Sequence, residues 1–231
     1  MRKIKQTNGS LTGQRLEEEV DKYRKVIEET PFCEEEEVLA LYMDYLRGLA
    51  LIAEDHLYNH EKEWQISSLA KRFLQYAVLL EPYNSYLDDL YQATSRITDV
   101  LYNHPRIKVQ LLEFSLLIVQ RQNAINGQKE IESAQLAETI QQMKDNIRHA
   151  DHNELDQIVQ LGVLKADPLE WTQQWEDVID EVEKEACMKT ADEPRGMGFC
   201  HHYWSVKEHI LWEKGINWRS PSAMNPRVLF D

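Results

Sequence analysis

Apolar side chains recur every three or four residues along most of this chain, and that period allows little except helix. Leu16, Val20, Tyr23 and Ile27 show the pattern in one stretch, and similar stripes follow in later stretches up to residue 189. No segment alternates apolar and polar residues convincingly, as a half-buried strand would. The 7 prolines fall at the ends of the apolar stretches, where they would stop or start helices. The sequence therefore predicts an all-α fold.

The predicted helices are joined by short loops, which favours antiparallel neighbours. We expect about seven helices in an antiparallel bundle or a short α-α stack, followed by a short aromatic helical module. Pro168 is predicted in the first turn of the last helix of the bundle, and a short helix in the module is predicted to start at Ser220-Pro221 and to stop at Asn225-Pro226. The clearest linker is TADEPRGMG, because a proline and two glycines fall within one polar run. Three parts follow: a flexible basic arm at 1–12, an acidic helical bundle at 13–190, and a linker with an aromatic module at 191–231, packed on the bundle.

Charge is spread unevenly along the chain, whose formal net charge is −14. The first ten residues carry +3 and residues 194–231 carry +2, so the body between them carries −19. Such a body repels nucleic acid and anionic membranes, because Lys and Arg supply most of the affinity for phosphate. We therefore expect a protein partner or self-association, and nucleic-acid binding through the basic ends ranks last.

Several features bear on where the protein works. No apolar run approaches the roughly 20 residues needed to span a bilayer. The start, MRKIKQTNGS, is basic but lacks the apolar run of a secretory signal. The 3 cysteines, Cys33, Cys187 and Cys200, fit a reducing compartment better than a disulfide framework. These features favour the cytoplasm.

Two histidines provide the main candidate for a metal site. His56 and His60 have H-x3-H spacing, which places both imidazoles on one helix face, a turn apart. The apolar stripe of the preceding turns continues onto both, so we expect both side chains to lean inward. A metal site needs at least a third ligand, for which His104 and Glu113 are candidates by residue type alone. The competing interpretation is a helix end whose histidines are hydrogen-bonded at its rim.

The acidic stretch WEDVIDEVEKE at 175–185 is a second candidate. Glu176, Asp180 and Glu183 share one helix face, at spacings of four and three residues. Carboxylates from two facing helices can hold magnesium, but these three fall on the polar side of the predicted helix. We therefore expect a solvated helix face rather than a magnesium site. The sequence has no phosphate-binding or nucleophile motif, and we assign no catalytic residue.

The aromatic module is rich in tryptophan, tyrosine, methionine and arginine, and several of these types dominate binding hot spots. On a helical wheel Tyr203 and Ile210 belong to one apolar stripe, whereas Trp204 and Leu211 belong to another on the opposite side. A helix that is apolar on two sides must be covered twice. The candidate partner-binding residues are Tyr203, Trp204, Leu211, Trp212, Trp218, Arg219 and Met224.

These patterns favour a non-catalytic intracellular role in protein interaction or scaffolding. Docking would use a groove between helices or the aromatic C-terminal surface, with a homodimer as one form of it. The competing interpretation is that the module only packs on the bundle. No cofactor is expected. The alternative function is a metal-binding helical bundle, as in a hydrolase, with zinc or iron at His56 and His60.

Overall fold

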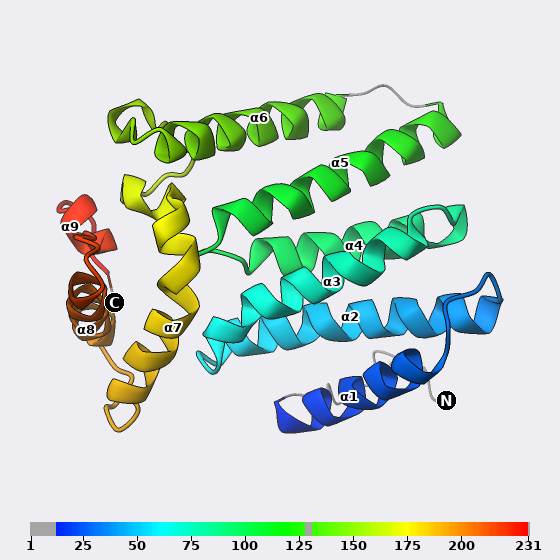
Figure 1. Ribbon diagram of the computed structural model, residues 1–231, viewed down its shortest axis with the longest axis horizontal. Coiled ribbons are helices and arrows are strands. Elements are labelled where there is room, and N and C mark those ends of the chain that lie inside the picture. The colour runs from blue at the N-terminus through cyan, green and yellow to red at the C-terminus, as the bar shows by residue number, and fades with distance from the viewer. Residues whose placement is uncertain (1–12, 128–130, 231) are drawn as a thin grey trace. The chain divides into compact units, whose positions relative to one another are not determined.

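In this computed structural model residues 13–127 and 131–230 are described, and all regular secondary structure among them is helical (Figure 1). The helices are α1 (Gln14–Glu29), α2 (Glu36–Tyr58), α3 (Ile66–Leu80), α4 (Leu87–Asp99), α5 (Pro105–Asn126), α6 (Ile131–Asp151), α7 (Gln173–Lys189), α8 (Phe199–Glu213) and α9 (Pro221–Met224). The predicted all-α class is confirmed. The arm expected at 1–12 lies outside the described residues.

Local sequence explains where several helices begin and end. The helix expected to open at Pro168 instead begins after Thr172, whose side chain accepts a hydrogen bond from Trp175 N and caps α7. The residues from Pro168 up to that cap form a short 3₁₀ turn. The short helix predicted between residues 220 and 226 is present, with Pro221 in its first turn and Asn225 at its end.

The described residues group into two compact units. The first lies within Met1–Tyr102 and Gln110–Ala137, and the second within Asn103–Val109 and Glu138–Asp231. The second unit therefore joins the aromatic module to α7 and to a short segment before and within α5. The boundary predicted at residues 190–191 stays a prediction. No helix within 13–127 or 131–230 is both long enough and apolar enough to cross a membrane.

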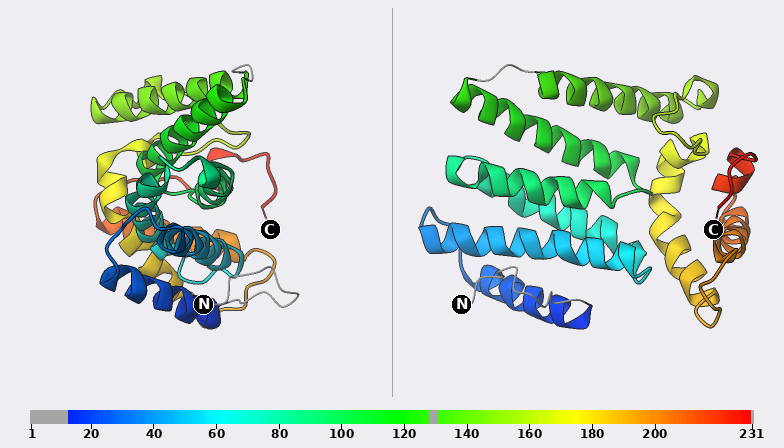
Figure 2. Two further views of the ribbon diagram at one scale, coloured as in Figure 1. Left: turned by 90° about the vertical axis from the view of Figure 1, so that its right-hand side faces the viewer. Right: turned by 180° about the vertical axis from the view of Figure 1, so that it is seen from behind.

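In the first unit α2 is the central helix, and α1, α3 and α4 pack against it (Figures 1 and 2). The apolar stripe predicted along this helix is confirmed from Val38 to Ile52, and it ends on the buried His56. Arg121 on α5 donates to Glu81 and Asn84, so hydrogen bonds tie α5 to the turn between α3 and α4.

Helix α1 approaches α2 closely at Gly48. A methyl group at this position would lie 2.5 Å from Cγ2 of Val20 and 3.3 Å from its Cγ1. Val20 is buried and β-branched, so it has few other rotamers to adopt. Glycine inside a helix costs about 1 kcal/mol relative to alanine, so the tight contact with Val20 accounts for its presence here.

In the second unit α8 packs on α7 (Figures 1 and 2). The core of this unit consists of Trp175, Ile179, Val182, Ala186, Ile210, Leu211, Ile216 and Trp218. The rings of Trp175 and Trp218 lie 5.8 Å apart between centroids. Residues beyond α8 therefore complete the core that the two helices begin.

Replacing Gly48 by alanine should destabilise the first unit. The gain in helix propensity is about 1 kcal/mol, whereas overpacking against Val20 costs about 1–3 kcal/mol. In the double variant Gly48→Ala/Val20→Ala the two methyl groups no longer clash, so its loss should be smaller than the sum of the single losses. Urea unfolding followed by circular dichroism measures all three. Additive losses would show that α1 does not contact α2 at this point.

Candidate functional site

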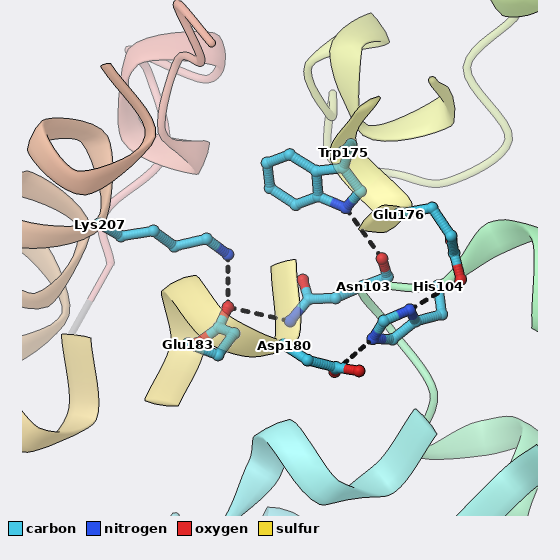
Figure 3. Close-up of polar contacts among 7 residues, drawn as sticks. All are labelled: Asn103, His104, Trp175, Glu176, Asp180, Glu183 and Lys207. Atoms are coloured by element: carbon cyan, nitrogen blue, oxygen red, sulfur yellow. Dashed lines mark hydrogen bonds and ion pairs between the residues drawn. The ribbon is translucent and has the colours of Figure 1, made fainter. Parts of the chain in front are cut away.

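A cluster of charged and polar side chains lies inside the second unit, where α7 meets α8 and the residues just before α5 (Figure 3). Its members are Asn103, His104, Glu176, Asp180, Glu183, Tyr203 and Lys207. We call this group the polar cluster. His104, Glu183 and Lys207 are all buried, which is rare for charged side chains unless they are paired.

Glu183 on α7 is the centre of one half of the polar cluster. Its Oε1 accepts hydrogen bonds from Lys207 Nζ at 2.5 Å and from Asn103 Nδ2 at 3.0 Å. Its Oε2 accepts a hydrogen bond from the hydroxyl of Tyr203. The buried carboxylate thus has a cation and two further donors, which is the arrangement needed to offset its desolvation.

Lys207 lies between two indole rings. Its Nζ is 4.9 Å from the ring centroid of Trp175 and 4.8 Å from that of Trp218, within range of cation–π attraction. Both indole N–H groups are satisfied, because Trp175 donates to the carbonyl of Asn103 at 2.9 Å and Trp218 donates to Glu170 at 2.7 Å. Burial raises the pKa of Glu170, although Trp218 and Lys207 oppose that change.

His104 joins the other half of the polar cluster to α7. Its Nδ1 lies 2.9 Å from Glu176 Oε1, and its Nε2 lies 2.9 Å from Asp180 Oδ1 (Figure 3). Burial alone would lower the pKa of His104, but the hydrogen bonds and charges of Asp180 and Glu176 outweigh it and raise the pKa to about 9. The ring is therefore an imidazolium at neutral pH, and both ring N–H groups donate.

The expectation that the acidic face of α7 is solvated was wrong. Glu176, Asp180 and Glu183 do share a face, but the side chains of Glu176 and Glu183 are only 10% and 7% exposed. That face meets His104, which is 72 residues from Glu176, and Lys207, which is 24 residues from Glu183. The spacing of the carboxylates was visible in the sequence, whereas the cations that satisfy them were not.

The two histidines of the H-x3-H pair do not come together. His56 is buried, and its Nε2 lies 3.0 Å from Oε1 of Glu17, which also accepts a hydrogen bond from Lys62 at 2.6 Å. Burial raises the pKa of Glu17, but the contacts with Lys62 and His56 outweigh it and lower the pKa. The inward orientation expected of His60 was wrong: α2 ends two residues earlier, the φ of His60 is 53°, and its side chain is 62% exposed beside Glu63.

Neither histidine gains a third metal ligand of the kind considered. His104 belongs to the polar cluster of the second unit, whereas Glu113 lies on α5 in the first unit, as His56 and His60 do. Within 13–127 and 131–230 no three His, Cys, Asp or Glu side chains are grouped so that they could hold a metal ion. Metal binding by His56 and His60 stays an untested alternative.

Four of the candidate partner-binding residues are committed to contacts within the second unit. Leu211 and Trp218 are part of its buried core. Tyr203 is half-buried and donates to the carboxylate of Glu183 in the polar cluster. Arg219 is exposed, but its Nε lies 3.0 Å from the buried carboxylate of Asp167. Leu211 and Trp218 are buried by these contacts, whereas the side chain of Arg219 is still 59% exposed.

The remaining three candidates lie nearer the surface. Trp204 is half-buried and packs on Phe230, with ring centroids 5.2 Å apart. Met224 is half-buried on α9. Trp212 is 67% exposed and stacks on His209, with ring planes 14° apart. Residues of both predicted stripes thus meet the same core, because Ile210 and Leu211 belong to it and Tyr203 and Trp204 pack against it. The indole of Trp212 faces solvent.

The chain matches no family model, no curated protein and no solved structure. Any function assigned to it therefore rests on its own residues.

The charged state of His104 should make the second unit less stable in alkaline solution. Its folded pKa of about 9 exceeds the unfolded value of 6.5, so the stabilisation is complete below 6.5 and is lost as pH rises through about 9. Urea unfolding of the wild type should show a free energy of unfolding that falls from neutral pH to about pH 10. The variant His104→Gln should lack this part of the fall, whereas the exposed-histidine variant His60→Gln should keep it. An identical pH profile in His104→Gln would contradict the assigned ion pairs.

Removing the charge of Lys207 alone should lower the free energy of unfolding more than removing the charges of both Lys207 and Glu183. Lys207→Met keeps an apolar stem between the indoles but leaves Glu183 charged, buried and without its cation, which costs about 3–5 kcal/mol. The double variant Lys207→Met/Glu183→Gln should recover much of that loss, because Asn103 can still donate to the amide oxygen and the hydroxyl of Tyr203 can accept a hydrogen bond from the amide NH₂. Lys184→Met on the exposed face of α7 is the matched control, expected within about 0.5 kcal/mol of wild type. Chemical unfolding measures all three, and a double variant no better than Lys207→Met would refute the pairing.

Proposed function

We propose that the protein is a non-catalytic protein-interaction or scaffold protein that docks through the aromatic surface of its second unit. The observation that carries this proposal is the exposed indole of Trp212, on a helix whose preceding residues, Ile210 and Leu211, are anchored in the core. Tryptophan is among the residue types most enriched in hot spots. The cytoplasmic location favoured by the sequence is part of the same proposal.

The surroundings of Trp212 support docking with little loss of entropy. Its ring stacks on the imidazole of His209, with centroids 6.3 Å apart, which favours one orientation of the indole. His209 is in turn within 3.5 Å of Glu213 on the next turn of the helix. A side chain that is already ordered in the free protein loses less conformational freedom when a partner covers it.

The polar cluster supports a structural role rather than a catalytic one. A general acid or base must reach a proton of the substrate, and a nucleophile must be accessible to it. Here His104 is engaged at both ring nitrogens, and Lys207 and Tyr203 both bind Glu183. These groups are paired with one another inside the unit, so we assign them to the frame on which Trp212 is displayed.

The variant Trp212→Ala tests this function. Tagged wild type, Trp212→Ala and Tyr58→Ala, which removes a similarly exposed aromatic from the first unit, would be compared by quantitative copurification and by light scattering. We expect a partner or a second copy to be retained by wild type and Tyr58→Ala and reduced about tenfold or more by Trp212→Ala, because truncating a hot spot costs at least about 1–2 kcal/mol. Circular dichroism should show all three equally folded.

Two results would overturn the proposal. One is a partner or dimer retained undiminished by Trp212→Ala. The other is a wild-type protein that copurifies with nothing reproducible and stays monomeric at all concentrations tested.

A further inference from the structure

Residues 158–166 are a part of the connection between α6 and α7 that has no regular secondary structure (Figure 1). Side-chain amides hold this loop in place. The buried Asn146 on α6 accepts a hydrogen bond from Val159 N at 2.9 Å and donates to Val159 O at 2.8 Å. Gln160 accepts from Ala166 N and donates to Ala166 O, both at 3.0 Å. The first amide fixes the start of the loop, and the second closes it.

A third amide fixes the far side of the same loop. Asn225, at the end of α9, accepts a hydrogen bond from Lys165 N at 2.9 Å and donates to Lys165 O at 2.8 Å. Each of the three amides therefore bonds both polar groups of one peptide residue, as a neighbouring strand would. Six hydrogen bonds hold a loop of nine residues, so its shape is set before anything binds to it.

The side chains that this loop displays are aliphatic. Val159, Leu161 and Leu164 are exposed, and Val163 is exposed to its full extent, at 102%. The run IVQLGVL at 158–164 contains no charge. Loops at protein surfaces are normally polar and mobile, and several aliphatic side chains held in water on a fixed backbone mark a surface that something covers.

The charges beside the aliphatic side chains indicate which chemistry covers them. Lys165 is the residue before the last one of the loop, and Arg227 lies in the turn that follows Asn225, where Val228 N donates to Asn225 O at 3.0 Å. Both cations are exposed at the end of the loop, whereas the exposed acid Asp156 lies before its start and accepts a hydrogen bond from Gln157. They stand out on a chain whose net charge is −14, and they favour acidic groups in whatever lies against them.

We propose that this loop docks a short segment of another protein that carries apolar side chains next to acidic ones. The loop offers four aliphatic side chains, which are too few to bury the roughly 800 Å² per partner that a stable dimer interface buries. It therefore fits a short segment better than a second copy of the chain. The net charge of −14 repels an extended anionic lipid surface more strongly than a short segment with few acidic residues, which lies mainly against the two local cations. The inference rests on the interaction role proposed above and adds a second surface, distinct from Trp212, with a defined partner chemistry.

Short random peptides displayed on phage provide the probe, with the full-length protein as bait. The apolar variant Leu161→Ser/Val163→Ser/Leu164→Ser replaces exposed aliphatic side chains. It keeps the three amides that hold the loop. The charge variant Lys165→Glu/Arg227→Glu reverses both cations. Lys184→Glu, on the exposed face of α7, is its matched control. Circular dichroism checks that each variant is folded.

We expect the enriched peptides to combine apolar and acidic residues. A synthetic copy, measured by fluorescence anisotropy, should bind each loop variant at least about tenfold more weakly than wild type, and should bind Lys184→Glu as well as wild type. Binding should also weaken as salt is added, because part of it is charge attraction. Peptides without an acidic excess, or peptides that bind the apolar variant equally well, would overturn the proposal.

Two parallel measurements test the other possible occupants of the loop, a membrane and a second copy of the chain. Binding of wild type, but not of the apolar variant, to vesicles of phosphatidylserine and phosphatidylcholine would assign the loop to a membrane and overturn the proposal. A dimer seen by light scattering and lost in the apolar variant would assign it to a second copy, with the same consequence. Trp212→Ala separates the two hypotheses: partner loss in that variant alone leaves the interaction role standing and rejects the loop as its site.

Discussion

The second unit depends on a carboxylate that has been taken out of water. Glu183 needs a cation and further hydrogen-bond donors to be buried at all. Lys207 and Tyr203 on α8 and Asn103, just before α5, supply them. An uncompensated buried charge costs several kcal/mol, so placements of α8 on α7 that miss these contacts are strongly disfavoured. We therefore expect the pair to contribute more to the uniqueness of the packing than to its net stability.

His104 applies the same constraint one turn earlier along α7. Its imidazolium binds Glu176 and Asp180, so one acidic helix face is tied to two cations from separate segments. The aromatic rings around Lys207 complete the enclosure, because their N–H groups also find acceptors. A frame fixed in this way can hold side chains such as Trp212 at its surface in a defined position, which is what recognition of a partner requires.

The sequence predicted what depends on residues close together along the chain. The helical class follows from the period of the apolar side chains, and the ends of α9 follow from Pro221 and Asn225. The inward orientation of Glu176 and Glu183 could not be predicted, because helical spacing gives the face but not the segment that packs on it. His60 shows another limit of such predictions. Its spacing from His56 would place both on one face of a helix, but α2 ends before it reaches His60. The amide-held loop depends on Asn225, which lies 60 residues from Lys165, and no local pattern announces that contact.

The side-chain amides that hold the loop also affect how it can change during evolution. They belong to Asn146, Gln160 and Asn225. Each needs an oxygen and an NH₂ group in a fixed order, and a carboxylate of the same outline would set a negative oxygen against a carbonyl. A single base change converts an asparagine codon into an aspartate codon. Such a change at Asn225 would break its contact with Lys165 of the loop and would leave the core of the second unit unchanged. This contact can therefore be gained or lost in evolution without a change of fold.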